Sequence, residues 1–343
     1  MGKKLILNGV TLTDASAPRL ANFDSLATQG SLLLIEPAHP ANPWAAGVPA
    51  NGTTLINVVE NYALATIGSA TPAHVRPVLL KPGNFGGSAG LLERSSKGGL
   101  HGISPQGGAA IVQSGPTIQF PTQIISYLLA HTDGVTSPHK FYASLWYELT
   151  RSPTTSYNNS TLFGINGNGQ QSNSALFYLA PSSSTASLHS ARPYNSFPSF
   201  EGGRIPTSSL GNKFVSLGSK FWHTTVSGVT QTPPISLPGD GTQTSVTGLL
   251  AGGGITFGSS ALVTGVSTTG TTGSAVIDPT SGSGSKDKAA SWKLYRFYLE
   301  DLTVSGRTYA EVDAMDNALY TQEVLTPGGR YYGDTQTSVS TIL

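Results

Sequence analysis

Two aromatic-rich segments constrain the fold of this chain more than any other feature. Residues 140–151 read KFYASLWYELTR, and their side chains alternate between two faces with a period of two residues. That period is typical of a β-strand. Residues 291–300, SWKLYRFYLE, alternate at first and then shift phase, because the apolar positions change from even numbers, as in Trp292, to odd numbers, as in Phe297. We therefore predict a second long strand here, with a β-bulge or with burial on both faces.

Short apolar runs bounded by turn residues recur along the rest of the chain. Residues 31–36, 55–59, 174–179 and 214–223 each have the length of one strand. Gly (41) and Pro (22) are frequent among the 343 residues and supply the turns between such runs. The pattern indicates about ten or more strands, which is typical of an all-β sandwich.

One short helix is predicted near the C-terminal end. Thr308 and Glu311 form the T-x-x-E pattern of a capping box, and an apolar stripe of Val312, Met315 and Leu319 follows. The helix should run from about residue 309 to 323 and stop before Pro327. Residues 123–130 fit either a short helix or a strand.

A single large domain is the simplest organisation for this pattern, since all-β domains run to about 250 residues. We predict an N-terminal arm over residues 1–30, a β-sandwich over residues 31–325 and a C-terminal tail over residues 326–343. We find no internal repeat.

The charged residues are few and unevenly placed. They make up 11% of the chain, against about 25% in an average soluble protein. Residues 224–285 hold only Asp240 and Asp278, and we read this region as Gly/Ser/Thr-rich hairpins. Permanent protein interfaces are depleted in charge. The charge-poor region and the arm are therefore the expected contacts with other proteins.

Composition and motifs exclude several classes of function. The absence of Cys excludes a thiol nucleophile, a disulfide scaffold and a cysteine metal centre. A net charge of +1 without a basic block argues against nucleic-acid binding. No run of 18 apolar residues suggests a membrane span, and the opening MGKKLILNGVTLTD lacks the apolar core of a secretory signal. We expect synthesis in a cytoplasm and no cofactor.

Three segments carry a resemblance to a known family. Residues 292–308 (WKLYRFYLEDLTVSGRT) resemble the C-terminal strand of concanavalin A-like (laminin G-like) jelly-roll domains, and in particular those of tailed-bacteriophage virion proteins. Residues 141–151 are similar to the central sheet strand of these domains, and residues 31–49 to the run-in. The three segments are framework motifs without functional residues.

The resemblance implies a non-enzymatic role in a virion. A decoration or cement protein that stabilises the capsid, or a tail component, would bind other virion proteins, the major capsid protein or tail proteins, through its arm and sheet edges. A homo-oligomer such as a trimer is expected for a decoration protein. The alternatives are a glycan-binding, lectin-like tail-fibre or receptor-binding module and, behind it, a glycan hydrolase.

The hydrolase alternative rests on Glu311, Asp313 and Asp316. Laminarinase-type glucanases share the jelly roll and carry E-x-D-x-x-E on a strand, where paired carboxylates act as nucleophile and general acid. Here the last position is Asp316, and the capping box places the motif on a helix. There, Glu311 and Asp313 should point about 200° apart, and acids in a first helical turn favour the helix dipole. We therefore expect no catalytic residues.

Two further sets of residues are candidates for a metal site and for a glycan site. His131, Asp133 and His139 have the spacing of metal ligands, with Glu148 the nearest further acid, but they lie in a Gly- and Pro-containing turn typical of a surface loop. We expect no metal site there. Glycan stacking would fall to aromatic residues in the loops, Tyr157 beside Asn158 and Asn159, Tyr194 and Phe197 around Asn195, and Trp222.

Overall fold

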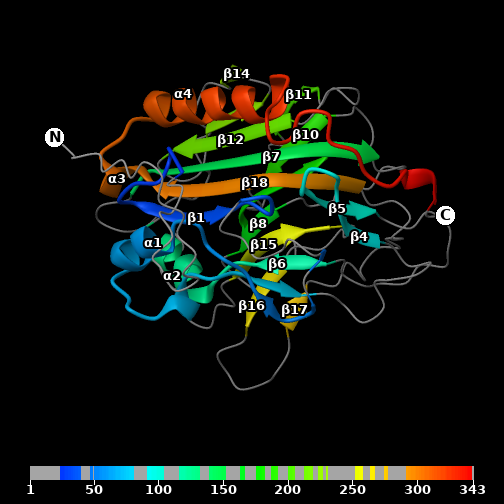
Figure 1. Ribbon diagram of the computed structural model, residues 1–343. Coiled ribbons are helices and arrows are strands. Elements are labelled where there is room, and N and C mark those ends of the chain that lie inside the picture. Colours follow the sequence, from blue (N-terminus) through cyan, green and yellow to red (C-terminus); the bar gives the residue numbers. More distant parts are fainter. Residues whose placement is uncertain are drawn as a thin grey trace, which may run out of the picture.

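The computed structural model describes residues 24–39, 47–48, 50–80, 91–103, 116–131, 139–151, 252–257 and 291–341, together with the backbones of the strands that lie between residues 163 and 276 (Figure 1). The predicted arm over residues 1–30 is described only from residue 24, where Asp24 and Leu26 pack against the sandwich. The loops that carry the glycan candidates lie outside the described residues.

The first of two large sheets, sheet A, is built on the two predicted aromatic strands. These are β7 (Phe141–Arg151) and β18 (Ser291–Asp301), which pair antiparallel along their whole length. Around them the order is β14 (Val229–Thr230), β13 (His223–Val226), β12 (Asn212–Gly218), β7, β18, β5 (Leu100–Ile103) and β4 (Leu91–Arg94). β1 (Ser31–Ile35) pairs with the second half of β18, and β5 pairs with the first half.

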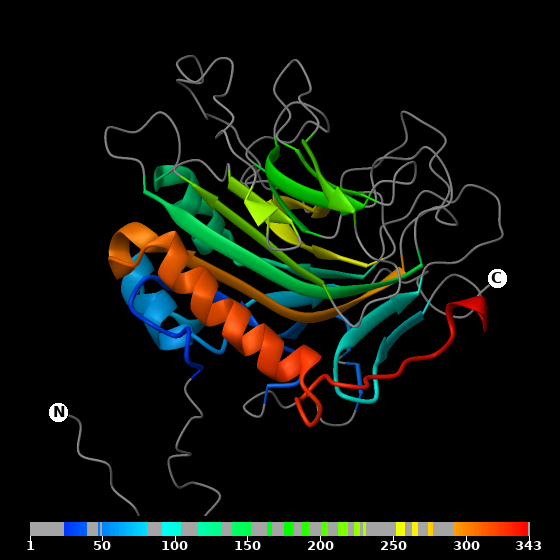
Figure 2. The ribbon, with the colours of Figure 1, turned by 90° about the horizontal axis from the view of Figure 1, so that it is seen from above.

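The second sheet, sheet B, lies against one face of sheet A (Figure 2). Its order is β11 (Phe200–Arg204), β10 (Ser187–Ala191), β9 (Ala175–Pro181), β8 (Phe163–Asn166), β15 (Gly252–Thr256), β6 (Thr117–Gln119), β3 (Val78–Leu80) and β2 (Thr53–Thr54). A separate hairpin joins β16 (Val263–Val266) and β17 (Ser274–Val276). The chain is therefore mostly β, with curled antiparallel sheets and a few helices, as expected for a β-sandwich.

The phase shift in residues 291–300 has a structural cause. The pairing of β18 with β7 changes register between Leu294 and Arg296, which is the predicted bulge. The extra residue brings the even-numbered Trp292 and the odd-numbered Phe297 to the same inter-sheet core. The predicted two-sided burial is also present, because all eleven residues of β18 are buried. Trp292 stacks on Phe257 of the opposite layer at a ring-centroid distance of 4.7 Å.

Two helices lie at one end of the sandwich (Figure 1). α2 (Thr122–His131) resolves the ambiguity at residues 123–130 as helix, and its Ile124, Ile125 and Leu128 enter the inter-sheet core. α1 (Glu60–Ile67) packs on β1 and ends at Gly68 in the left-handed conformation. The predicted strand at residues 55–59 is wrong. The buried Asn57 side chain there bonds to the backbone of Leu32, Leu34 and Val75 instead, which holds the segment outside a sheet ladder.

The outer face of sheet A, opposite sheet B, is covered by the end of the chain (Figure 2). After the four-residue α3 (Leu302–Ser305), the predicted capping box opens α4 (Tyr309–Tyr320), and a π turn (Thr321–Leu325) follows. Val312, Met315 and Leu319 pack toward Tyr142 and Tyr298 of the sheet, as the predicted stripe requires. A C-terminal segment, residues 326–341, continues with a short 3-10 turn (Val339–Thr341) at its end. A second 3-10 turn (Pro72–His74) follows α1.

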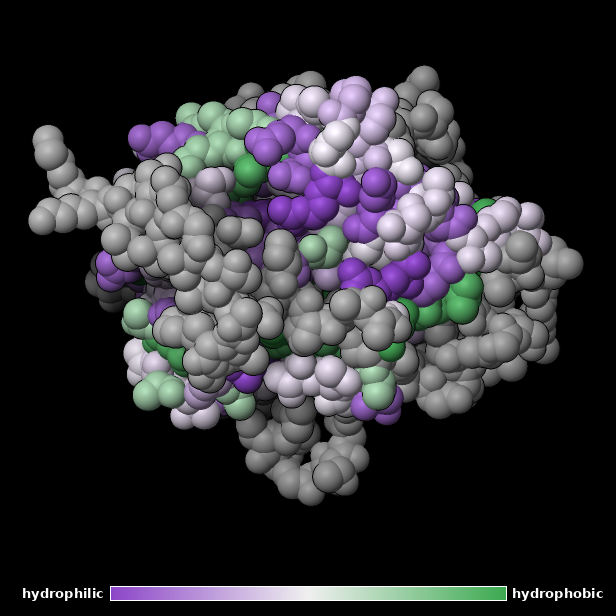
Figure 3. Space-filling model, in the orientation of Figure 1, coloured by the Kyte–Doolittle hydropathy of each residue, from purple (hydrophilic) through white to green (hydrophobic). Residues whose placement is uncertain are grey.

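No helix among the described residues is both long enough and apolar enough to cross a bilayer. In the view of Figure 3, hydrophilic residues gather across the middle of the face that α4 borders.

Candidate functional site

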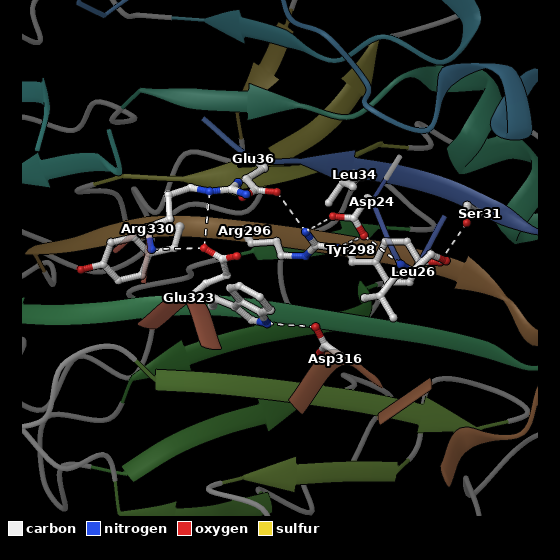
Figure 4. A network of polar contacts seen from close by, with 12 residues as sticks. Asp24, Leu26, Ser31, Leu34, Glu36, Arg296, Tyr298, Asp316, Glu323 and Arg330 are labelled. Atoms are coloured by element: carbon white, nitrogen blue, oxygen red, sulfur yellow. Dashed lines mark hydrogen bonds and ion pairs between the residues drawn. The ribbon is translucent and has the colours of Figure 1, made fainter. Parts of the chain in front are cut away.

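Three ionic side chains lie buried on the outer face of β18. Lys293, Arg296 and Glu300 are each at most 2% exposed, although they belong to the central strand of the sandwich. Buried charges need partners, because transfer of an unpaired ion out of water is costly. Each of the three has partners outside its own strand, and Figure 4 shows those of Arg296, which come from the start of the described chain.

Arg296 joins the start of the described chain to β18. Its Nη1 lies 2.6 Å from Asp24 Oδ2 and 2.9 Å from Glu36 Oε2, and its Nη2 lies 2.7 Å from Asp24 Oδ1. The second oxygen of Glu36 accepts hydrogen bonds from Arg330 and from the Tyr331 hydroxyl, at 3.2 Å for the latter. We call Asp24, Glu36, Arg296, Arg330 and Tyr331 the outer-face network. It ties residues 24–36 and 330–331 to one strand.

The pKa values in this network follow from the pairing. Burial by itself raises the pKa of the Asp24 carboxyl, but hydrogen bonds from Arg296 and the charge of Arg296 outweigh burial, so that the pKa lies below its usual value. Burial by itself lowers the pKa of Arg296, yet Asp24 and Glu36 raise it above its usual value. Both groups are therefore held in their charged forms, and neither is poised to exchange a proton near neutral pH.

Lys293 attaches the C-terminal segment to the same strand. Its Nζ lies 2.7 Å from Glu148 Oε2, 3.1 Å from Asp334 Oδ2 and 2.9 Å from Gln336 Oε1. The other oxygen of Asp334 accepts from the backbone N–H of Lys97 at 2.7 Å. The C-terminal segment, for which the sequence predicted only a tail, thus lies against the sheet and is held there by the buried Asp334.

Glu300 joins β18 to the link between α3 and α4. Both of its oxygens accept hydrogen bonds from Arg307, and Oε2 also accepts from the Tyr298 hydroxyl at 2.7 Å. Tyr298 in turn contacts Ser31 of β1, with 2.8 Å between the two hydroxyl oxygens. Lys293 and Arg296 therefore hold the described ends of the chain against β18, and Glu300 holds the link between α3 and α4. All three side chains are buried.

The carboxylates of the hydrolase alternative do not form a pair. Glu311 is exposed, and its Oε2 accepts hydrogen bonds from the backbone N–H and the hydroxyl of Thr308 in the capping box. Asp316 is fully buried under α4 and accepts from the Tyr142 hydroxyl at 2.8 Å and from Trp146 Nε1 at 3.1 Å. Asp313 is half-buried on the same helix. A retaining glycosidase needs two carboxyl groups facing one bond, about 5–5.5 Å apart, and this helix presents its acids to different surroundings.

His131 and His139, the two histidines with the spacing of metal ligands, come together at the end of α2. The rings of His131 and His139 have centroids 4.3 Å apart, and the His139 backbone N–H donates to the His131 carbonyl at 2.8 Å. His139 Nδ1 lies 2.6 Å from Asp301 Oδ2, which also accepts from the Tyr127 hydroxyl at 2.8 Å. We call Tyr127, His131, His139 and Asp301 the histidine cluster.

Asp301 is held rigidly in that cluster by its place at the start of α3. Its Oδ1 caps the helix by accepting from the backbone N–H groups of Thr303 and Val304, at 2.9 and 3.1 Å. Burial, with help from Asp301, raises the pKa of Tyr127 and keeps its hydroxyl protonated as a donor. The sequence spacing pointed to the two histidines but not to Asp301. Asp301 caps a short helix, and nothing in the sequence indicates its contact with His139.

Other predicted candidates do not join this cluster or lie outside the described residues. Glu148 pairs with Lys293, and Asp133 falls in the segment that the structure does not describe. Within the described part of the chain, no three His, Asp or Glu side chains are arranged to hold a metal ion. The glycan candidates around Tyr157, Tyr194 and Trp222 also lie outside the described residues.

Comparison with known proteins gives structural similarities only. No family model and no curated protein matches the chain. Among solved structures, Trypanosoma rangeli sialidase is similar at 12% identity and a TM-score of 0.35, over 82% of this chain and 33% of that chain. Alginate lyase A1-II′ is similar at 10% identity and a TM-score of 0.35, over 63% and 85% of the two chains. The carbohydrate recognition domain of Emp47p is similar at 11% identity and a TM-score of 0.28, over 64% and 89%.

This chain thus spans a third of the length of the sialidase. The three similarities are too low to bear on function. The β-sandwich rests on the two sheets described above.

Proposed function

We propose that this chain is a non-enzymatic structural protein of a tailed-bacteriophage virion, a concanavalin A-like jelly-roll module that serves as a decoration or cement protein on the capsid or as a tail component. The observation that carries the proposal is the use of the buried ionic groups on sheet A. Lys293 and Arg296 bind the described chain ends to the central strand, and Glu300 binds the link between α3 and α4.

A surface closed in this way fits a protein whose task is mechanical. The outer face of an open sandwich sheet is a natural place for a binding cleft, but here α4 and the C-terminal segment cover it. The partner contacts are then assigned to the N-terminal arm and to the charge-poor region over residues 224–285. Low charge suits permanent interfaces, because charged side chains are costly to desolvate there.

The experiment that tests the proposal looks for the chain in assembled particles. Virions purified from the source are analysed by mass spectrometry and labelled with gold-coupled antibodies against the chain. We expect the chain to co-purify with particles in a fixed ratio to the major capsid protein or to a tail protein. Its absence from intact particles would overturn the proposal.

A truncation separates assembly from folding. Deleting residues 2–20 removes most of the arm but keeps Asp24 and Leu26, which pack against the sandwich. We expect the thermal unfolding midpoint to stay unchanged and particle binding to fall at least tenfold. Equal particle binding by the truncated and full-length chains would exclude the arm as a partner contact.

A glycan array addresses the alternative function. Saturable binding of a defined glycan, lost in Trp222→Ala or Tyr194→Ala, would favour a lectin-like receptor-binding module. Polysaccharide cleavage that is lost in Glu311→Gln would favour a hydrolase. We expect neither, together with a stable homo-oligomer in light scattering.

A further inference from the structure

The sequence pattern led us to expect no metal site at His131 and His139, but the structure brings their rings together. We propose that the two histidines form a binding site for one divalent transition-metal ion, such as Zn²⁺ or Ni²⁺. The two rings lie at the junction of α2, the start of β7 and the end of β18. The structural role proposed above makes no use of either ring. The argument rests on the tautomers of the two rings, their separation and their surroundings.

The hydrogen bonds of the two rings fix the tautomer that a metal-binding histidine needs. His131 Nδ1 lies 2.8 Å from the Tyr127 carbonyl oxygen, and His139 Nδ1 lies 2.6 Å from Asp301 Oδ2. Both partners are acceptors, so each Nδ1 carries a proton and donates it. In a ring that carries a single proton, the lone pair is then on Nε2. Among the described residues, which leave out 132–138, neither Nε2 has a hydrogen-bond partner. Metal-binding histidines nearly always show this pattern, with the other ring nitrogen fixed by a carbonyl or a carboxylate.

The rings are also close together and held in place. Their centroids are 4.3 Å apart with planes inclined by 38°, and the backbone bond from His139 to His131 fixes the spacing. The Tyr127 ring packs on His131 with a centroid distance of 4.2 Å. Because the backbone and ring packing already hold both rings, a metal ion would bind without first having to order two free side chains.

Access and charge favour a cation at this place. The His139 side chain is 21% exposed and His131 is partly exposed, so an ion can enter from solvent. The carboxylate of Asp301 lies directly behind His139 and fixes the orientation of its ring. Imidazole ligands select Zn²⁺, Ni²⁺ or Cu²⁺ over Mg²⁺ and Ca²⁺, which prefer oxygen. Water molecules would complete the coordination, since no third His, Asp or Glu of the described residues is placed to serve as a ligand.

Calorimetric titration of the untagged full-length protein with Ni²⁺ and with Zn²⁺ tests the site. We expect one ion per chain and a loss of affinity of at least tenfold in His131→Phe, which keeps an aromatic ring against Tyr127 but removes Nε2. The matched control is His74→Phe, since His74 lies on another turn with Ser69 as its partner. It should bind as the wild type does. Unchanged binding in His131→Phe, or no binding in the wild type, would overturn the proposal.

A second measurement uses the wild-type chain alone and does not depend on how a variant folds. Diethylpyrocarbonate acylates unprotonated, accessible imidazole nitrogens, and mass spectrometry of peptides reports each histidine separately. Saturating Zn²⁺ should slow the acylation of His131 and His139 at least fivefold and leave that of His74 unchanged. Equal rates at all three positions with and without Zn²⁺ would refute the site.

Discussion

Replacing Arg296 by methionine tests whether the outer-face network holds the chain ends onto β18. Methionine is similar in length and keeps apolar contact with the Trp146 ring, over which the guanidinium lies at 5.0 Å from the ring centroid. The change removes the charge with its hydrogen bonds and its cation–π contacts with Trp146 and Tyr298. Asp24 and Glu36, whose side chains are 8% and 2% exposed, are then left as buried carboxylates without the guanidinium between them.

The loss of unfolding free energy can be estimated from the partners that Asp24 and Glu36 keep in the variant. Removing one partner of a buried ion pair costs about 3–5 kcal/mol, because the other charge stays buried and unpaired. Glu36 keeps Arg330, and Asp24 keeps the N–H of Leu26 at 2.9 Å. We therefore expect a loss near the middle of that range, about 4 kcal/mol. Folded domains are stable by only about 5–15 kcal/mol, so the loss should be large on that scale.

Urea unfolding followed by tryptophan fluorescence and circular dichroism measures the difference. With a slope of about 3 kcal/mol per molar urea, the midpoint of Arg296→Met should fall by about 1.3 M. The matched control is Arg76→Met, which breaks an equally bidentate pair with Glu60, at 2.5 and 2.9 Å, whose side chains are 41% and 21% exposed. An exposed pair of this kind contributes about 1 kcal/mol or less.

A double variant distinguishes loss of pairing from loss of packing. In Arg296→Met/Asp24→Leu one of the two unpaired acids is gone, and we expect about 2 kcal/mol of the loss to be regained, since a buried ion pair can often be replaced by apolar side chains. The reasoning fails if Arg296→Met costs no more than Arg76→Met, or if the two single losses simply add in the double variant.

Three further predictions concern the N-cap of α4, the stability of the fold at low pH and the close approach of β15 to β6. Thr308→Ala removes the hydroxyl that accepts from the Glu311 N–H, and it should lower the free energy of unfolding by about 1 kcal/mol in urea titrations. The pKa values of Asp24 and Glu93 lie below their ordinary 3.8 and 4.5 in the folded chain, so their stabilisation is complete above those values and is lost as the pH falls through the lower folded ones. The thermal midpoint should therefore drop steeply below about pH 4, and less steeply in Asp24→Asn; parallel curves would contradict this assignment. Gly254→Ala would place a Cβ 2.5 Å from the backbone oxygen of Ile118, and a loss of about 1–3 kcal/mol is expected in thermal scans, whereas an unchanged midpoint would show that β15 can move away from β6.

The elements that sequence reasoning predicted best are those whose evidence is local. The alternation in residues 140–151 and the phase shift in residues 291–300 gave β7, β18 and the bulge between Leu294 and Arg296. The capping box gave the start of α4, since Thr308 and Glu311 are only three residues apart. Period and capping depend on neighbours along the chain, so one sequence is enough to find them.

The helix α1 was missed for the opposite reason. Its N-terminus has no side-chain cap, and its sequence ENYALATI shows no clear apolar stripe; only Ala63 is fully buried. The preceding run of residues 55–59 has the composition of a strand, yet Asn57 makes buried bonds to residues 18 to 25 positions away. Contacts over such separations override local propensity, and the sequence contains no pattern that marks them.

The histidine cluster shows how far site prediction could go. The spacing of His131 and His139 was visible, and so was the surface turn between them. What the spacing did not contain was Asp301, which comes from the far end of β18 and bonds to His139 across 162 positions. Glu148, the nearest further acid in the sequence, pairs with Lys293 instead.

The sequence by itself determined that the chain is mostly β, where its two longest strands run, which strand bulges and where the last helix begins. These follow from side-chain period, cap chemistry and the scarcity of charge, all of which are local or compositional. The tertiary structure alone decided what the ionic residues of β18 do. Arg296 meets Glu36, and Glu36 meets Arg330, across separations of 260 and 294 residues. Those pairs exist because a buried charge must find its counter-charge wherever the fold brings one near, and no spacing along the chain encodes that choice.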